Sequence, residues 1–571
     1  MIIREKPQVK EDLIDNILYN SVEDINFHLF PNEEHNIDTS KLNSIPLFSK
    51  AVETLYKHLD SANSKIAILV DNDMDGFASA TLFIKFMQEL NYPIDIIIDE
   101  GKTHGLTQNA MNTVLTNEYN LIIIPDSGSN DIDQHKLLRQ HNVDFIVLDH
   151  HHVEEDNIPH LNDNGIVINN QLLDLNKNYT GVGMVYIFLQ YINVYKNLNL
   201  DLEKYLDLVM LGSTGDVADI SDKELRNYTV KGTQNINNKF IKTVLEQRGI
   251  KDPTTRDMSF SIISMVNAVC RIGTVDEKHL LINSFTNQSN EKVEMEVRSK
   301  NKVTKKMEKD TKEVSIEEYA YDVCRKIKDK QDRQVKKAVE DVEYINEENV
   351  IIGLLPDKHN SSLTGLIAMK IMSKTGLPTL IGKDYDGYYA GSARSTNNLK
   401  EKLYETGLFD LVQGHSNAFG WQLQKDILTN LLDWTTSLEQ TETYHLVDRI
   451  YDNPESKVIY EVDSRKGVFG GRVEYPLLAY ENISFHRSCI NARGSMLKLL
   501  ENKVEFVLFN APEGLYDRLM SSVANGRVNV SIVGEPSIND FGGRLSAQIV
   551  IKDLEIKEKE EDTMNSFGVD F

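Results

Sequence analysis

The chain has 571 residues, of which 40% are hydrophobic and 26% are charged. These values are ordinary for a globular protein, and the length predicts about two to four domains. The net charge of −25 argues against simple binding of a phosphate backbone over the whole surface, although an acidic metal site beside a local basic groove remains compatible with it. The three cysteines, Cys270, Cys324 and Cys489, are far apart, which argues against a disulfide framework or a zinc ribbon and favours the cytoplasm.

A parallel α/β domain is expected over residues 61–285, after a helical N-terminal segment over 1–60. Four apolar stretches, 65–70, 94–99, 121–125 and 144–148, are rich in Ile and Val without alternation. Such strands are typical of a parallel sheet that is buried on both faces. Segment 76–87 between the first two has the periodicity of a helix. No apolar run of about 18 residues occurs in the chain, so no membrane span is expected.

The second half of the chain changes character several times. Residues 286–346 are dense in mixed charge and nearly free of Gly and Pro, and we expect a long exposed helix that connects two domains. A second, smaller α/β domain is expected over 347–437. Residues 438–556 contain several β-type stretches, the first at 457–462, which predict a small β-barrel. Residues 557–571 form an acidic tail that we expect to be disordered.

Acidic residues and histidines follow three of the four predicted strands. Asp71, Asp73 and Asp75 come directly after the first, Asp126 after the third, and the segment 149–152 (Asp-His-His-His) after the fourth. The carboxyl ends of parallel strands meet at one edge of the sheet, where ligands bind. Oxygen and imidazole ligands without a thiolate suit Mn²⁺ or Mg²⁺. A pair of such ions can activate water and stabilise both in-line oxygens of a phosphoryl displacement, so the pattern predicts a metal-dependent phosphoesterase.

These motifs resemble the DHH phosphoesterase superfamily, whose name is the motif formed here by residues 149–151. Within it the chain resembles the RecJ single-stranded-DNA exonucleases over nearly its full length, through the stretches 71–76 (DNDMDG), 125–128 (PDSG) and 215–219 (GDVAD). The resemblance implies a two-metal site, with Asp71, Asp149 and His151 orienting the ligands or contacting the scissile phosphate. Asp216 stands where these sequences usually have Thr, so its role is open. The implied metal ligands are Asp73, Asp75, Asp126, His150 and Asp219.

Other stretches extend the resemblance to substrate binding. The segments 102–106, 267–273, 391–395 and 413–420 are similar to basic and Gly-rich motifs of the RecJ proteins. Arginine suits such a role because its planar fork can bind two phosphate oxygens at once. The resemblance also implies that the second α/β domain is of the DHHA1 type and that the C-terminal β-domain is OB-like. The implied substrate-binding residues are Lys102, His104, Asn267, Arg271, Ser392, Arg394, Gly414 and His415.

The leading hypothesis is therefore an exonuclease that hydrolyses single-stranded DNA with Mn²⁺ or Mg²⁺ in DNA recombination or repair. Its 5′ to 3′ polarity is implied by the resemblance alone. Its expected partners are single-stranded DNA and, as further candidates, a single-strand-binding protein or a helicase. One alternative is a phosphodiesterase for short oligoribonucleotides or cyclic dinucleotides, which uses the same chemistry. Another is a metal-binding scaffold that no longer cleaves.

Overall fold

A computed structural model describes residues 1–300, 307–395, 398–438, 444–541 and 543–557. The chain forms two compact units: Pro31–Thr441 is the larger, and Met1–Phe30 joins Glu442–Phe571 in the smaller. The expected helical segment over 1–60 is therefore divided between the two units. Within the described residues no helix is both long and apolar enough to cross a membrane.

The larger unit contains the predicted parallel sheet. Its strand order is β3-β2-β4-β5-β6, and every neighbouring pair is parallel. Side chains of β2 alternate between two cores: Ile68 and Val70 face one, and Ala67 and Leu69 face the other. The near-continuous apolar character of the strands follows from this burial on both faces. The strands are β2 (Ile66–Val70), β3 (Asp95–Ile98), β4 (Leu121–Pro125), β5 (Asp144–Asp149) and β6 (Ile166–Asn169).

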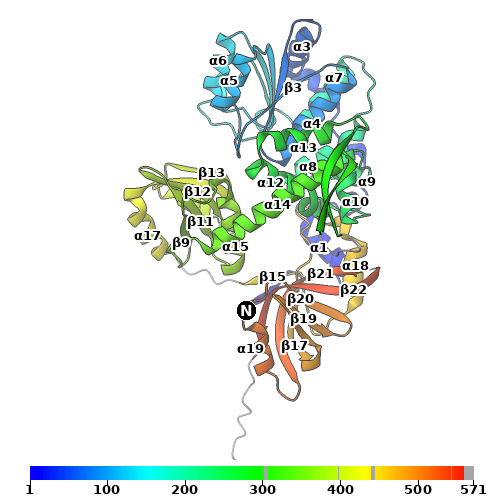
Figure 1. The fold of residues 1–571 in the computed structure, drawn as a ribbon, viewed down its shortest axis with the longest axis vertical. Helices are drawn as coiled ribbons and strands as arrows, with labels where there is room; N and C mark the ends of the chain where they lie inside the picture. Colours follow the sequence, from blue (N-terminus) through cyan, green and yellow to red (C-terminus); the bar gives the residue numbers. More distant parts are fainter. Residues whose placement is uncertain (301–306, 396–397, 439–443, 542, 558–571) are drawn as a thin grey trace, which may run out of the picture. The chain divides into compact units, whose positions relative to one another are not determined.

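Helices cover both faces of this sheet (Figure 1). One core joins the sheet to α3 (Pro46–Leu59), α4 (Met74–Glu89), α7 (Gly181–Tyr195) and α8 (Leu206–Gly215). The other joins it to α5 (Gln108–Thr116) and α6 (Ile132–Gln140). Further helices complete the larger core: α9 (Lys223–Gln234), α10 (Lys239–Arg248), α11 (Thr255–Met258), a π-helix (Ser259–Ile263), α12 (Ser264–Ile272) and α13 (Val275–Thr286).

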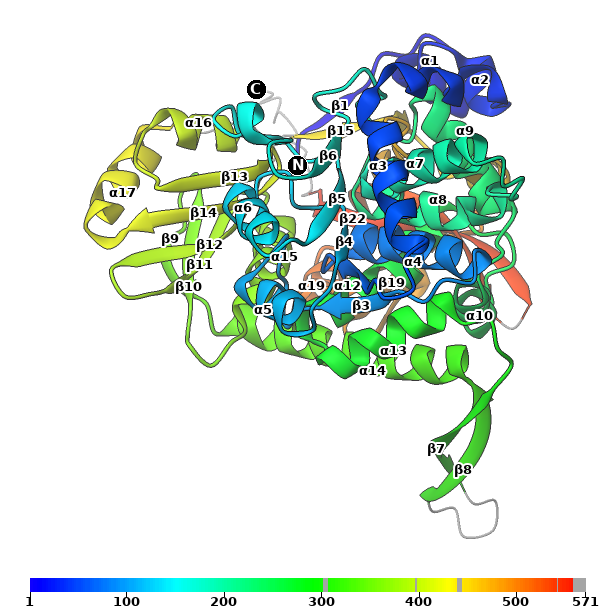
Figure 2. The ribbon, with the colours of Figure 1, turned by 90° about the horizontal axis from the view of Figure 1, so that it is seen from above.

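The charged connector is only half helical. Strands β7 (Lys292–Lys300) and β8 (Met307–Ser315) form an antiparallel hairpin, which projects from the larger unit in Figure 2. The prediction of one helix over 286–346 is therefore wrong for this part. Val293 and Met295 alternate with Glu294 and Glu296, and this period of two is that of a strand. The high density of charged residues in this segment obscured the alternation in the sequence.

Helix α14 (Ile316–Glu340) follows the hairpin and is not fully exposed. It begins with a capping box between Ser315 and Glu318. Its buried side chains recur at helical spacing and form a stripe along one face. The helix contacts α10, α12, α13 and α15. The stripe consists of Ala320, Cys324, Ile327, Gln331, Val335 and Ala338.

A second sheet with accompanying helices lies in the region where a second α/β domain was predicted. Its six strands have the order β13-β14-β12-β11-β10-β9, and only β10 and β11 are parallel. The strands are β9 (Glu343–Asn346), β10 (Ile351–Leu355), β11 (Thr379–Asp384), β12 (Tyr388–Arg394), β13 (Leu411–His415) and β14 (Ala418–Gln424). The helices are α15 (Thr364–Thr375), α16 (Leu399–Glu405) and α17 (Leu428–Ser437).

The smaller unit is built around a seven-stranded sheet of order β16-β17-β21-β22-β20-β19-β18. Segment 457–462, predicted as a strand, lies in helix α18 (Ser456–Ser464), because Ile459 and Val462 face the core at helical spacing. The tail 558–571, predicted to be disordered, lies outside the described residues. The other elements are β1 (Ile3–Glu5), α1 (Leu13–Ser21), α2 (Ile25–Leu29), β15 (His445–Val447), β16 (Arg449–Tyr451), β17 (Leu478–His486), β18 (Ile490–Arg493), β19 (Met496–Glu501), β20 (Val504–Leu508), α19 (Leu515–Ser521), β21 (Arg527–Phe541) and β22 (Arg544–Ile556).

Candidate metal centre

Three adjacent strands deliver acidic residues to one edge of the parallel sheet. Strand β2 is followed by the turn 71–75, in which Asp73 caps helix α4 by accepting the amide of Gly76 at 3.1 Å. Strand β4 is followed by Asp126, whose φ of 61° lies in the left-handed region. Strand β5 ends at Asp149, and His150 comes next. The left-handed backbone of Asp126 is strained, and such strain is concentrated at functional sites.

Three overlapping groups of side chains could each hold a metal ion, with all their ligand atoms within 4.8 Å of one another. Asp126 and His150 each belong to two of the groups. The groups are Asp71, Asp73 and Asp126; Asp75, His150 and Asp216; and Asp126, His150 and His151.

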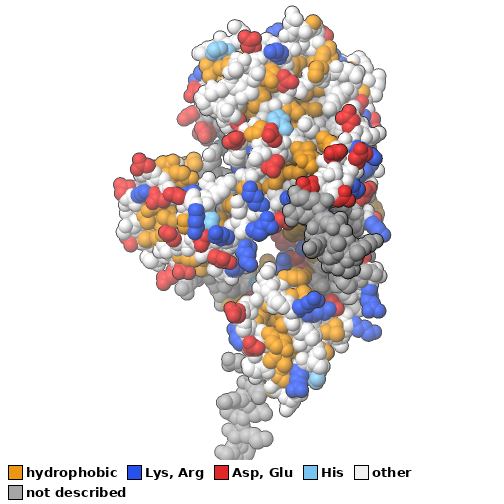
Figure 3. Space-filling view, in the orientation of Figure 1, with side chains coloured by type: hydrophobic (Ala, Val, Ile, Leu, Met, Phe, Trp, Pro, Cys, Tyr) orange, Lys and Arg blue, Asp and Glu red, His pale blue; other side chains and the backbone are white. Residues whose placement is uncertain are grey.

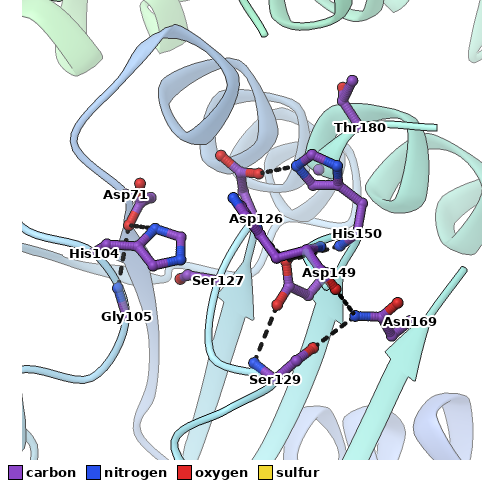
Figure 4. A network of polar contacts seen from close by, with 12 residues as sticks. Asp71, His104, Gly105, Asp126, Ser127, Ser129, Asp149, His150, Asn169 and Thr180 are labelled. Atoms are coloured by element: carbon purple, nitrogen blue, oxygen red, sulfur yellow. Dashed lines mark hydrogen bonds and ion pairs between the residues drawn. The ribbon is translucent and has the colours of Figure 1, made fainter. Parts of the chain in front are cut away.

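Two buried atoms at the centre fit a cation directly. Nε2 of His150 and Oδ1 of Asp126 face each other at 3.1 Å (Figure 4), yet neither takes part in a well-formed hydrogen bond among the described residues. Leaving buried polar atoms unsatisfied costs about 1–3 kcal/mol each. Carboxylate and imidazole donors without sulfur are those that Mn²⁺ and Mg²⁺ accept, so the residues present fit such an ion.

Helix α7 orients the carboxylate of Asp75. The side chain of Thr180 donates to Oδ1 at 3.0 Å, and the amides of Gly181 and Val182 donate at 2.7 and 3.0 Å. These donors lie at the start of α7, where amides are free and the helix dipole favours negative charge. Gly212 lets helix α8 approach, because a Cβ there would lie 2.4 Å from Asp75 Oδ1.

The carboxylates repel one another in the absence of a cation. Burial, with Asp216 and Asp73 nearby, raises the pKa of Asp75 to about 6. Burial and the charge of Asp73 raise the pKa of Asp216 to about 7. Burial and the neighbouring acids raise the pKa of Asp126 well above its ordinary value. Each shift measures how strongly this site disfavours unneutralised negative charge, and a divalent cation would supply the missing positive charge.

Asp149 has a different environment from these acids. It accepts hydrogen bonds from the amides of Ser129, His150 and His151 at 3.1, 2.7 and 3.2 Å, and from Nδ1 of His151 at 2.8 Å. Burial alone would raise its pKa, but the charge and hydrogen bonds of His151 outweigh burial and lower it. Asp149 therefore remains ionised and fixes the loop that presents His150.

Asn169 completes this support. Its amide donates to Ser129 Oγ at 2.9 Å and to the carbonyl of His151 at 3.0 Å (Figure 4). Neither Asn169 nor Thr180 was predicted from the sequence. Asn169 ends strand β6, which was not among the predicted strands; the short apolar stretch 166–168 before this polar residue is the signal that could have identified it.

The loop between β3 and α5 brings His104 to the acidic turn. Nδ1 of His104 lies 3.1 Å from Asp71 Oδ1, which also accepts the amide of Gly105 at 3.2 Å (Figure 4). Burial disfavours the imidazolium, but the charge of Asp71 outweighs it and raises the pKa of His104 to about 9. The rings of His104 and His151 are 4.6 Å apart. His104 is therefore a cationic group beside the metal candidates.

The structure brings Asp216, and not the predicted Asp219, into a candidate ligand group of the described residues. Helix α8 ends at Gly215, so Asp216 caps it and points back to the sheet edge, 3.7 Å from His150 Nε2. At Val217 the chain turns with a φ of 57°, and this side chain is 88% exposed. Asp219 lies beyond the turn and accepts the amide of Ser221 at 3.1 Å. The geometry thus favours the first acid after the helix.

Two of the predicted substrate-binding residues lie on α12. Nη1 of Arg271 donates to the carbonyl of Asn267 at 3.3 Å, and Arg271's own carbonyl accepts Ser362 Oγ of the second α/β domain at 3.1 Å. Oδ1 of Asn267 is buried without a hydrogen bond among the described residues. Lys102 is exposed on the His104 loop.

Ser392 and Arg394 lie on β12 of the second sheet. Oγ of Ser392 is 2.9 Å from Oγ1 of Thr364, and Nη1 of Arg394 donates to the carbonyl of Ala393 at 2.7 Å. Burial lowers the pKa of Arg394, and the charge of Arg271 lowers it further. The two guanidinium groups are therefore near enough for their charges to interact.

Gly414 and His415 are not joined to this pair by any contact of the described residues. Both lie on β13, where the carbonyl of Gly414 accepts Lys400 Nζ at 2.5 Å. The side chain of His415 lies outside the described part of the chain. Their role in substrate binding remains a prediction.

Known proteins are similar to this chain in sequence or in fold. Residues 65–213 match the DHH family, N-terminal domain. The chain is 29% identical to the putative SPbeta prophage-derived single-strand DNA-specific exonuclease YorK of Bacillus subtilis, over 96% of this chain and 97% of that protein. It is 23% identical to the single-stranded-DNA-specific exonuclease RecJ of the same species, over 88% and 62%. The fold is similar to that of RecJ in complex with Mn²⁺ from Thermus thermophilus, with a TM-score of 0.65 and 16% identity over 90% of this chain and 72% of the other.

Proposed function

Because the chain is a RecJ-like member of the DHH superfamily, we propose that it is a metal-dependent exonuclease that hydrolyses phosphodiester bonds of single-stranded DNA. The observation that carries the proposal is the convergence of acids and imidazoles at the ends of β2, β4 and β5. The names of the relatives supply the substrate class. The polarity, 5′ to 3′, follows from the resemblance alone.

We assign two adjacent positions for Mn²⁺ or Mg²⁺. Asp75, His150 and Asp216 would hold one, and Asp71, Asp73 and Asp126 would hold the other. Bound there, the ions would lower the pKa of a water molecule and stabilise the attacking and leaving oxygens. This assignment replaces Asp219 by Asp216.

The protein's own residues then position the substrate. His104, cationic and held by Asp71, would donate a hydrogen bond to an oxygen of the scissile phosphate. Asp149 holds His150 and His151 in place. Lys102, on the same exposed loop as His104, would attract the neighbouring phosphate.

The guanidinium pair would bind the terminal phosphate of the strand. Arg271 and Arg394 repel each other until an anion lies between them, and each can offer two parallel donors to a phosphate. Figure 3 shows Lys and Arg side chains gathered over α14 and α15, which fits a strand that approaches along this face despite the acidic net charge. Ser392 and the unsatisfied Oδ1 of Asn267 would orient the terminal nucleotide.

The domain boundaries are also part of the proposal. We propose residues 61–285 as the DHH domain, 347–437 as a DHHA1 domain, and the seven-stranded sheet as an OB-like module for single strands. A single-strand-binding protein or a helicase remains a candidate partner.

One assay tests the function. Release of label from 5′- and 3′-labelled single-stranded DNA and RNA is measured with Mn²⁺, with Mg²⁺ and with EDTA, beside a dinucleotide substrate. We expect short products from the 5′ end of DNA, with either ion and none with EDTA. Faster turnover of the dinucleotide would favour the alternative phosphodiesterase. No cleavage of any substrate with either ion would contradict both enzymes.

Arg394→Met tests the terminal-phosphate site. Loss of a charge-assisted hydrogen-bond pair of about 1.5–3 kcal/mol should raise KM for a 5′-phosphorylated strand about 10- to 100-fold. The effect on a strand with a 5′-hydroxyl should be much smaller. Arg325→Met is the matched control, because this arginine of α14 is exposed and paired with Asp322 at 2.9 Å. Equal effects on both substrates would remove Arg394 from the site.

A further inference from the structure

Lys278 of helix α13 is completely buried, with an exposed fraction of 0%. Its Nζ donates to Oδ1 of Asn72 at 2.6 Å and to the carbonyls of Asp99 and Gly101, both at 2.7 Å. The three protons of the ammonium are thus matched by three acceptors. Burial lowers the pKa of Lys278, which reflects the cost of removing a charge from water.

The three acceptors belong to the two segments that build the metal centre. Asn72 lies between Asp71 and Asp73 in the acidic turn after β2. Asp99 and Gly101 open the loop that carries Lys102 and His104. The ammonium of Lys278, on helix α13, therefore links the acidic turn after β2 to the loop that carries Lys102 and His104.

Asn72 strengthens this bridge. While its Oδ1 accepts from Lys278, its Nδ2 donates to Oγ1 of Thr103 at 2.7 Å. The ion pair between His104 and Asp71 then joins the same two segments on the side that faces the site. Lys278 contacts the same two segments from the interior of the protein, at the end of the network opposite to the His104–Asp71 pair.

Filling a core does not explain a lysine at this position. Lysine is almost never fully buried unless it is paired, and the three acceptors of Lys278 are an amide oxygen and two backbone carbonyls, none of them a carboxylate. A methionine would occupy a similar volume without the desolvation cost. What methionine cannot do is hold three oxygens from two segments around one point.

We propose that Lys278 is a positioning residue that holds the acidic turn and the His104 loop in register, and so sets metal affinity and substrate binding together. The proposal rests on the function proposed above. Residues that orient metal ligands typically change metal affinity or activity about 10- to 100-fold when they are removed. A displacement of about 1 Å in a reacting group can cost about 100-fold in rate.

The first experiment compares Lys278→Met with Lys239→Met in the full-length protein. Lys239 is the matched control. Its Nζ also donates to two backbone carbonyls, those of Gln288 and Ser289, and to Oδ1 of Asn290, but these contacts lie at the surface. We expect Mn²⁺ binding, measured by calorimetry without substrate, to weaken about 10- to 100-fold in Lys278→Met only. Amide exchange of segment 99–106 should also become faster only in this variant.

A second variant keeps the proposal testable if Lys278→Met does not fold. Asn72→Ala removes one of the three acceptors and should weaken Mn²⁺ binding with a smaller change in exchange of segment 99–106. If both single variants fold, the double variant should lose little more than Lys278→Met, since residues in one network are not additive. Unchanged Mn²⁺ affinity and unchanged exchange in the folded variants would overturn the proposal.

These measurements distinguish a failure of the Lys278 proposal from a failure of the proposed exonuclease function. Metal binding and amide exchange need no nuclease activity, so they report on Lys278 even if the wild-type protein cleaves no DNA. If the wild-type protein is active, KM for single-stranded DNA should rise and kcat should fall in Lys278→Met. A change in thermal stability alone, with metal affinity and both kinetic constants intact, would show a merely structural role and contradict positioning.

Discussion

Asp126→Asn is expected to abolish DNA cleavage and, at the same time, to stabilise the metal-free protein. The carboxylate lies in two candidate ligand groups, so its loss should remove several kcal/mol of metal-dependent transition-state stabilisation, which corresponds to about a 10³-fold lower rate. Without metal, the same carboxylate is buried among Asp75, Asp73 and Asp71. Replacing this carboxylate by a neutral amide of similar shape removes its repulsion by the neighbouring acids and its charge desolvation, so the metal-free protein should gain stability.

The pH dependence fixes the sign of this second effect. Burial raises the pKa of Asp126 in the folded protein above its unfolded value. The wild-type protein therefore loses stability as pH rises from about 4 through the folded pKa, whereas an asparagine does not titrate. The stability gain of Asp126→Asn should be large at pH 8 and small near pH 4. Asparagine also tolerates the left-handed backbone at this position.

Thermal unfolding with EDTA and with Mn²⁺ measures both effects. With EDTA at pH 8, the variant should unfold at a higher temperature than the wild type; with Mn²⁺ the order should reverse, because only the wild type gains binding energy. Asp133→Asn, on exposed helix α6, is the control and should change neither activity nor stability. A variant that is less stable with EDTA at pH 8 would contradict the picture of an electrostatically strained site.

The sheet edge could be predicted because it depends on local signals. Apolar strands without alternation define β2, β4 and β5, and the residues directly after them are placed by the topology of a parallel sheet. Asp73, Asp126 and His150 follow from this rule alone. Part of the second sheet was also visible, since β10 and β11 overlap the apolar stretches 349–355 and 378–382.

The remaining features depend on contacts between distant residues. Strand β1 pairs in parallel with β15, Ile3 opposite His445, and no local pattern predicts that residues 1–30 belong to the C-terminal unit. Lys278 meets Asn72 across 206 positions of sequence. In the hairpin over 292–315, the mixed charge favoured a helix, whereas the alternation of side chains favoured strands.

The choice between Asp216 and Asp219 shows the limit of motif spacing. Both acids occur in the stretch 215–219, and the match to the family pattern selected Asp219. Which of them reaches the sheet edge depends on where α8 ends and on the direction of the chain at Val217. A helix end is among the least certain features of a sequence-based assignment, so the choice between Asp216 and Asp219 stays a prediction until it is tested.

Asp216→Asn and Asp219→Asn form a matched pair that decides this question. Asp216→Asn should weaken Mn²⁺ binding and lower kcat/KM by about 10²- to 10³-fold, since it removes a charged ligand candidate beside His150. Asp219→Asn keeps an oxygen that can accept the Ser221 amide, so it should change activity by less than about threefold and stability by about 1 kcal/mol or less. Calorimetric Mn²⁺ titration and single-turnover cleavage measure both variants.

The two acids also differ in what they should do to the metal-free protein. Burial and Asp73 raise the pKa of Asp216 to about 7, so its ionised form costs stability above that pH, and Asp216→Asn should raise the unfolding temperature at pH 8 with EDTA. A loss of Mn²⁺ affinity in Asp219→Asn, with normal affinity in Asp216→Asn, would restore the ligand chosen from the motif.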